Sequence, residues 1–120
     1  MPQLIVVPNA LLTVVETNAY LAKAARILSA GERSEIVDTL ASDPQCGDVV
    51  PGGGGIRKVR FGAKGKGKRG GVRVIYYYHS RRMPLFLLTV FGKNEKSDLS
   101  QGEIRQLAKA VKQIPSTYGA

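Results

Sequence analysis

Several residue types on which common enzyme and membrane classes depend are scarce in this chain. Cys46 is the single cysteine in 120 residues, so neither an internal disulfide nor a cysteine metal cage is possible. His79 is the single histidine, which excludes catalysis by a pair of histidines. No apolar run approaches the roughly 18 residues of a membrane helix, and MPQLIVVPNA lacks the basic start of a signal peptide. We therefore expect a cytoplasmic protein without a membrane partner.

The most uneven absence is that of acidic side chains. Residues 49–94 carry eleven lysines and arginines and no aspartate or glutamate, whereas residues 1–48 have a net charge of −3 and residues 95–120 of +1. A two-metal site needs carboxylate ligands, which this segment lacks, so we expect no metal and no cofactor there. A field of one sign is typical of proteins that bind polyanions, and it favours a nucleic-acid partner over a merely solvated surface.

Hydrophobic patterning in the N-terminal half predicts a strand followed by a helical hairpin. Leu11–Glu16 is rich in β-branched residues, which indicates a strand. Ala19–Leu28 has one apolar stripe at helical spacing. A capping box at Ser29 and Glu32 starts a second helix that ends near Asp43, and helices joined so tightly should pack antiparallel.

The C-terminal half predicts a meander of strands closed by a helix. Gly47–Gly55 is interpreted as a flexible connection, and a capping box at Ser100 starts an amphipathic helix that Pro115 stops. The expected order β-α-α-β-β-β-α gives an α+β domain with an antiparallel sheet and helices mainly on one face. We expect an N-terminal extension at residues 1–10, the domain at 11–115 and a C-terminal tail at 116–120. The three expected strands are Ile56–Phe61, Val72–Tyr78 and Leu85–Phe91.

The strand period of two sorts the basic residues by face. In the first strand of the predicted hairpin, Lys58 and Arg60 lie on one face and the apolar residues beside them lie on the other. Arg73 joins Lys58 and Arg60 if the valines of the second strand face the core. Neighbouring strands lie about 4.8 Å apart, so three such cations repel one another unless an anion lies between them. Lys93, directly after the last strand, approaches the same face from its end.

The connection Gly62–Gly71 adds further cations that alternate with glycines. A hairpin needs only about two to five linking residues, so this longer loop indicates an arm that follows a nucleic-acid backbone; a long solvated hairpin is the alternative. GAKGKGKR within it nearly spells a P-loop, but arginine replaces the final Ser/Thr and a strand follows, so nucleotide hydrolysis is not predicted. The cations of the loop are Lys64, Lys66, Lys68 and Arg69.

Two long segments resemble a known family. GDVVPGGGGIRKVRFGAKGKGKRGGVRVIYYY, from Gly47, and LLTVFGKNEKSDLS, from Leu87, are similar to the HigB-like branch of the RelE superfamily, the toxins of type II toxin–antitoxin pairs. The likeness runs from about Leu11 to Ile114. It implies a microbial-RNase fold, with the sheet packed on the N-terminal helical hairpin and the C-terminal helix. It also implies metal-free cleavage of mRNA in the ribosomal A site, by attack of the ribose 2′-hydroxyl on the adjacent phosphate.

The same resemblance implies a set of catalytic cations at Lys58, Arg60, Arg73 and Lys93. One lysine or arginine would help to deprotonate the 2′-hydroxyl, Arg73 would bind the phosphate, and another cation would aid the leaving 5′-oxygen. Arginine stays protonated and suits charge stabilisation. A lysine among other cations has its pKa lowered, which makes it the better proton carrier.

Contact with RNA or the ribosome is expected from a second set of residues. Tyr77 or Tyr78 is placed to stack on a base, although at least two of the three consecutive tyrosines should pack in the core. Where better-known members carry an arginine and a tyrosine, this chain has Asn94 and Ser100, so the proton-donor and base-stacking roles are unassigned. The full set is Arg57, Lys64, Lys66, Lys68, Arg69 and Tyr77.

The partners implied are mRNA, ribosomal RNA and a cognate acidic antitoxin that docks on the basic surface. Three alternatives stay open from the residues alone. One is a non-catalytic nucleic-acid-binding domain, one is a ParE-like relative acting on DNA gyrase, and one is a small ribosome-associated structural protein. Gyrase-directed relatives generally lack the convergence of Lys58, Arg60 and Arg73 on one face. The geometry of these three residues therefore distinguishes an RNA-cleaving toxin from a gyrase-directed one.

Overall fold

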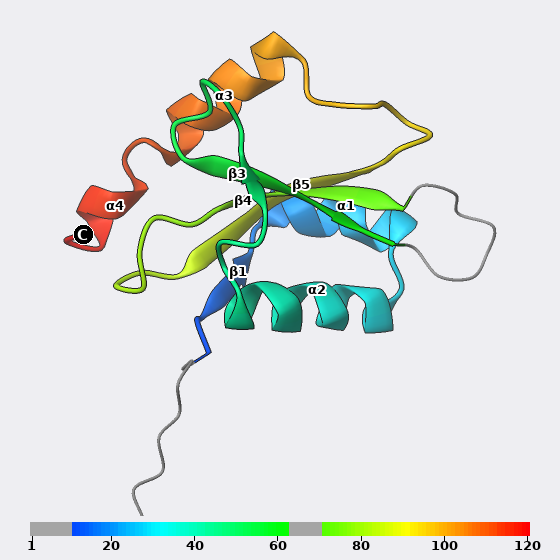
Figure 1. The fold of residues 1–120 in the computed structure, drawn as a ribbon, viewed down its shortest axis with the longest axis horizontal. Coiled ribbons are helices and arrows are strands. Elements are labelled where there is room, and N and C mark those ends of the chain that lie inside the picture. Colours follow the sequence, from blue (N-terminus) through cyan, green and yellow to red (C-terminus); the bar gives the residue numbers. More distant parts are fainter. Residues whose placement is uncertain (1–10, 63–70) are drawn as a thin grey trace, which may run out of the picture.

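The computed structural model describes residues 11–62 and 71–120, so the extension expected at residues 1–10 lies outside the described residues. Within the described part the chain forms the α+β fold that the patterning predicts, with helices on a five-stranded sheet (Figure 1). No helix in these two stretches is both long and apolar enough to cross a membrane. In chain order the elements are β1 (Val14–Glu16), α1 (Asn18–Ile27), α2 (Ala30–Ser42), β2 (Asp48–Val49), β3 (Ile56–Phe61), β4 (Val72–Tyr77), β5 (Leu85–Gly92), α3 (Gln101–Val111) and α4 (Ile114–Thr117).

Side-chain caps fix where the main helices begin. Both predicted capping boxes are confirmed: the hydroxyls of Ser29 and Ser100 accept the N–H of Glu32 and Glu103, and each glutamate accepts the backbone N–H of its serine in return. The hydroxyl of Thr17 accepts the N–H of Tyr20 at 3.2 Å and caps α1. Each cap satisfies backbone donors that the first helical turn leaves without partners.

The sheet has the order β1-β5-β4-β3-β2 and is mixed rather than purely antiparallel. Strands β3, β4 and β5 pair antiparallel in succession, as predicted, but β1 pairs parallel with β5. The hairpins leave the outer edge of β5 open, and β1 covers it while running in the same direction. Strand β2 lies within the segment expected to be a flexible connection and pairs antiparallel with β3. Through its hydrogen bonds to β3, this short strand forms the other edge of the sheet.

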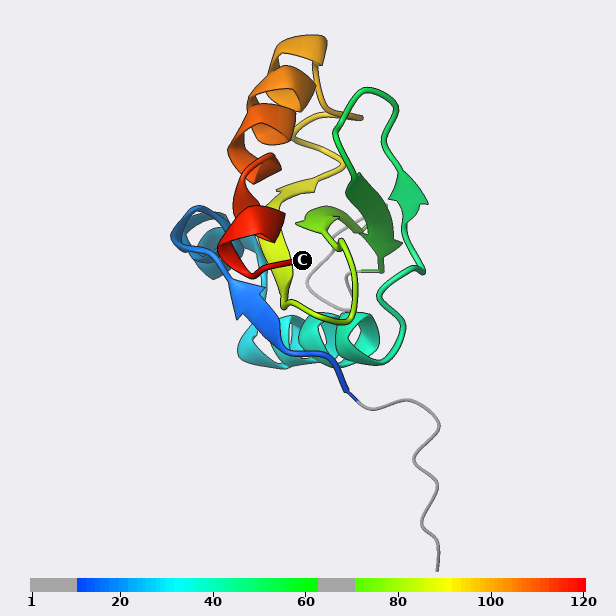
Figure 2. The ribbon, with the colours of Figure 1, turned by 90° about the vertical axis from the view of Figure 1, so that its left-hand side faces the viewer.

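The helices cover both faces of the sheet, which corrects the expectation that they lie mainly on one. In Figures 1 and 2, α1 and α2 lie on one side of the sheet and α3 on the other. The first core cluster joins Tyr20, Ile36 and Leu40 of α1 and α2 to one sheet face. The second joins Ile104 and Val111 of α3 to the other face. The alternation of strands β4 and β5 therefore buries both sets of side chains.

The C-terminal helix ends earlier than expected, and a short helix follows it. Helix α3 ends at Val111, and Pro115 lies in the first turn of α4 instead of stopping α3. Proline fits there because the first turn has no intrahelical use for its missing N–H. The expected tail at residues 116–120 thus includes the end of α4, and the ring of Tyr118 lies edge-on to Phe86 at 6.0 Å.

Candidate nucleic-acid interface

The pairing of β3 with β4 brings the predicted basic residues of the two strands to one face. Arg60 lies directly opposite Arg73, and Lys58 lies two residues before Arg60 on the same side of β3. Val59 and Phe61, on the other side, pack against the first core cluster. We call Lys58, Arg60 and Arg73 the cationic face. The expected convergence of these three residues on one side of the sheet is confirmed.

The cationic face remains open because α3 covers only part of this side of the sheet. Ile56, Ile75 and Tyr77 lie on the same side as the cations but belong to the buried second core cluster under α3. Arg60 is exposed, and Lys58 and Arg73 are half-buried. One side of β3 and β4 is thus divided into an apolar part under a helix and a cationic part facing solvent.

A carboxylate from the chain before α3 contacts the cationic face. The ammonium Nζ of Lys58 lies 3.0 Å from Oδ1 and 2.9 Å from Oδ2 of Asp98. The Oδ1 atom also accepts the N–H of Leu99 at 2.8 Å, which fixes the orientation of the carboxylate. The hydrogen bond from Lys58, the bond from Leu99 and the nearby charge of Arg73 hold the pKa of Asp98 below its usual value. Asp98 is therefore ionised at neutral pH and partly neutralises the cations.

The expected fourth catalytic cation, Lys93, lies at the end of the same sheet. It directly follows β5, its side chain is exposed, and its backbone N–H donates to the carbonyl of Gly71 at 3.3 Å. Because Arg73 pairs with Phe91, Lys93 lies two residues further along the strands, roughly 7 Å from the level of Arg73. The structure therefore places Lys93 beside the base of the β3–β4 connection and not within the cationic face itself.

Gly71 at this base tolerates no other residue in its present conformation. Its φ is +67°, and a Cβ on it would lie 2.1 Å from the carbonyl oxygen of Phe61. Only glycine allows the two strands to approach so closely where the basic loop ends and β4 begins. The loop cations Lys64, Lys66, Lys68 and Arg69 lie outside the described residues.

Two residues of the expected RNA-binding set have structural partners instead. Arg57 lies on the opposite side of β3 from the cationic face, and its Nη1 donates to the carbonyls of Gln45 at 3.3 Å and Gly47 at 2.7 Å. It therefore fastens the chain after α2 to the sheet. Tyr77 is only 4% exposed in the second core cluster, so its ring offers no face to a base. Helix α3 packs over this side of the sheet (Figure 1), which explains the burial of Tyr77.

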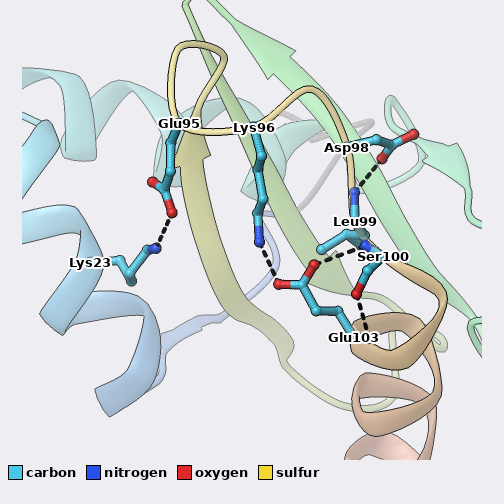
Figure 3. A network of polar contacts seen from close by, with 7 residues as sticks. All are labelled: Lys23, Glu95, Lys96, Asp98, Leu99, Ser100 and Glu103. Carbon is cyan, nitrogen blue, oxygen red and sulfur yellow. Dashed lines mark hydrogen bonds and ion pairs between the residues drawn. The ribbon is translucent and has the colours of Figure 1, made fainter.

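The connection from β5 to α3 is held by ion pairs on both sides (Figure 3). Glu95 accepts from Nζ of Lys23 in α1 at 2.8 Å, and Lys96 pairs with Glu103 at the start of α3. The ammonium of Lys96 also lies 4.9 Å above the ring of Phe91. Figure 3 shows the carboxylate of Asp98 turned away from these pairs. The connection and the first turn of α3 therefore carry three carboxylates, each paired with a different lysine.

Asp98 is the residue that sequence reasoning missed. The segment without carboxylates ends at residue 94, and the helices were expected mainly on one face of the sheet. The usable signal was the capping box at Ser100, two residues after Asp98, because it fixes where α3 begins. Helix α3 contacts β3, so the residues just before it return over the cationic face. Within residues 11–62 and 71–120, no group of three or more histidine, cysteine, aspartate or glutamate residues is placed to hold a metal ion.

Comparison with known proteins now identifies the family. Residues 18–118 match the family model described as the RelE toxin of the RelE/RelB toxin–antitoxin system. The chain belongs to the RelE toxin family. The structure is also similar to that of a free-state double mutant of the E. coli toxin RelE, with a TM-score of 0.55 and 16% identity over 83% of this chain and 96% of that chain. At this identity the likeness to E. coli RelE concerns the fold, and the HigB-like branch of the RelE superfamily stays a prediction.

Proposed function

We propose that this RelE-family chain is the toxin of a type II toxin–antitoxin pair and cleaves mRNA in the ribosomal A site without a metal ion. The observation that carries the proposal is the pairing of Arg60 with Arg73 on an exposed part of the sheet beside Lys58. Two arginines on adjacent strands are about 5 Å apart at their Cα atoms, which suits the oxygens of a single phosphate. Arginine binds phosphate through a planar fork of donors.

The chemistry proposed is attack of the ribose 2′-oxygen on the adjacent phosphorus. Negative charge then accumulates on the phosphate oxygens, and the guanidinium groups of Arg60 and Arg73 lie where they stabilise it. Preorganised donors of this kind contribute about 10²–10³-fold each. Neither arginine takes the proton of the hydroxyl, because arginine stays protonated in proteins. Lys93 and the loop cations Lys64, Lys66, Lys68 and Arg69 are assigned to the RNA or ribosomal backbone.

Membership of the RelE family implies an antitoxin partner. The chain has a net charge of +9, and all of this excess comes from residues 49–94, so the partner proposed is an acidic protein that docks on this basic segment in the cytoplasm. Electrostatic complementarity of this kind speeds association and excludes wrong partners. Docking over the cationic face would prevent RNA from reaching it.

The deciding experiment is primer extension on a reporter message in a bacterial translation extract. We expect cuts within translated codons, and none in the same message when translation initiation is blocked. Arg73→Ala should reduce cleavage by at least about 100-fold. Arg105→Ala, which removes an exposed arginine from α3, is the matched control and should cleave normally. Cleavage unaffected by Arg73→Ala, or arrest of DNA gyrase without cleavage of the message, would contradict the proposal.

A further inference from the structure

Attack by the 2′-hydroxyl needs an acceptor for its proton, and the cationic face supplies none. Arg60 and Arg73 are always charged, and an ammonium group has donors but no lone pair. The Nζ of Lys58 lies within 3.0 Å of both carboxylate oxygens of Asp98, a pairing that requires its charged form. A base must therefore come from a residue beyond these three cations.

Asp48 of β2 lies opposite Lys58 in the strand pairing, but the carboxylate that the ammonium of Lys58 contacts is that of Asp98. Three other candidate bases in the described ranges are engaged elsewhere or far away. His79 follows β4 at the end opposite Arg73, and its ring lies 6.4 Å from that of Tyr77. The carboxylate of Glu95 is paired with Lys23 in α1. Glu103 is held by Lys96 and by its own capping box. Each of these groups points to a partner outside the cationic face.

Asp98 meets the geometric requirements of a base. Its carboxylate contacts Lys58 and lies near Arg73, so it borders the position proposed for the phosphate. Its side chain is 56% exposed, against 32% for Lys58, so an RNA strand has access to it. The bond from Leu99 N–H to Oδ1 fixes the carboxylate, while the lone pairs directed away from Leu99 remain accessible. A candidate base is judged first by such reach and then by its pKa.

We infer that Asp98 is a catalytic residue, the acceptor of the 2′-hydroxyl proton; this inference rests on the proposed function. The bond from the 2′-oxygen to phosphorus forms as the hydroxyl proton passes to a carboxylate oxygen of Asp98. The bond from phosphorus to the 5′-oxygen breaks, its electron pair leaves with that oxygen, and the oxygen takes a proton from water. The resulting hydroxide recovers the proton from Asp98. The products are a 2′,3′-cyclic phosphate and a 5′-hydroxyl, and the protein returns to its starting state.

The first test compares Asp98→Asn with wild-type protein on programmed ribosomes. Asparagine keeps an oxygen for Leu99 N–H and Lys58 but accepts no proton, so we expect kcat to fall by about 100-fold or more. KM should stay the same or decrease, because the variant loses a negative charge beside the RNA. Glu95→Gln, which removes a carboxylate three residues earlier, is the control and should leave kcat unchanged. An Asp98→Asn variant that cleaves as fast as wild type would overturn the inference.

The second test is the pH dependence of the single-turnover rate between pH 6 and pH 8. The charged groups facing Asp98 are Lys58 from β3 and Arg73 from β4, and both keep it ionised throughout this range. With Asp98 as the base, the wild-type rate should change by less than about twofold. A lysine base, with an ordinary pKa near 10.4, would give a rise of about tenfold per pH unit. Such a rise would reduce Asp98 to a positioning residue for Lys58 and overturn the inference.

Asp98→Glu and Arg73→Ala complete the design. Glutamate restores a carboxylate and should recover part of the activity that asparagine loses, whereas a role limited to capping Leu99 would leave both variants alike. Failure of the inference and failure of the proposed function are distinguishable. If wild type cleaves, Arg73→Ala does not and Asp98→Asn does, only the inference falls. If wild type cleaves no message on the ribosome, the proposed function itself falls.

Discussion

The two faces of the sheet are formed by the same strands but differ in how far their side chains are buried. On the face toward α1 and α2, Val72, Val74 and Tyr76 of β4 are each 2% exposed or less and join a continuous core. On the other face, Ile75 is fully buried under α3, whereas Arg73 remains partly open to solvent. The closed face is built for stability. The opposite face is divided between an apolar part under α3 and a cationic part that is open to solvent.

This difference means that neighbouring residues in one strand should respond to substitution in opposite ways. Removal of a side chain from the closed face costs burial and leaves a cavity. Removal of a cation from the open part relieves repulsion and should cost little stability, although under the proposed function it removes a contact to RNA.

The largest loss of stability is expected from a cavity on the closed face. Leu87 of β5 is fully buried in the first core cluster. Leu87→Ala should reduce the free energy of unfolding by about 2–5 kcal/mol, as measured by urea denaturation. Arg60→Ala on the open part is the counterpart and should change it by less than about 0.5 kcal/mol. A comparable loss from Arg60→Ala would show that the cationic face is part of the core.

The next largest loss of stability is expected at Gly71, where the basic loop ends and β4 begins. Gly71→Ala places a Cβ against the Phe61 carbonyl and forces a residue with φ of +67° into a strained conformation. We expect a loss of about 1–3 kcal/mol in the free energy of unfolding. Gly62→Ala, where an added Cβ meets nothing within 4 Å, should be nearly neutral. Equal stability of the two variants would contradict the close approach of the strands at Gly71.

Whether the sequence predicts a feature of these two faces depends on how far apart in the sequence the contacting residues lie. Local signals gave the capping boxes, the hairpin strands and the shared face of Lys58, Arg60 and Arg73, because period and capping act within a few residues. The expectation that the helices lie mainly on one face was wrong, since an amphipathic helix such as α3 fits either face of a sheet whose strands are apolar on both. That choice decides the burial of Tyr77 and the return of Asp98 to β3. Both depend on contacts distant in sequence.

An effect of similar size is expected from the tyrosine hydroxyls of the closed face. Tyr76 donates its hydroxyl to the carbonyl of Pro44 at 2.8 Å and accepts the N–H of Gly47 at 2.9 Å. Tyr76→Phe leaves both backbone groups without this partner and should cost about 1–3 kcal/mol in urea denaturation. The hydroxyl of Tyr20 is buried and has no hydrogen-bond partner among the described residues, so Tyr20→Phe should be neutral or stabilising. The reverse order of the two variants would contradict these bond assignments.

The smallest effect concerns the chain that passes from one face to the other between β5 and α3. Glu95 pairs with Lys23 of α1 on the closed face. On the opposite side, Asp98 pairs with Lys58 of β3 and Lys96 pairs with Glu103 in the first turn of α3. The bonds from Lys23 to Glu95, from Lys58 to Asp98 and from Lys96 to Glu103 hold the pKa of each carboxyl below its usual value. Groups with a lowered pKa in the folded state contribute stability above their unfolded pKa and lose it as the pH falls.

The free energy of unfolding should therefore fall modestly as the pH is lowered from about 5 toward 3, because all three pairs are partly exposed and are screened by solvent. Urea denaturation at closely spaced pH values measures this loss. Lys23→Met removes the partner that lowers the pKa of Glu95, so the variant should lose less stability over the same range than the wild type does. An identical pH dependence in the variant would mean that the pair of Lys23 and Glu95 does not hold α1 to the connection in solution. The two faces would then be joined through the sheet alone.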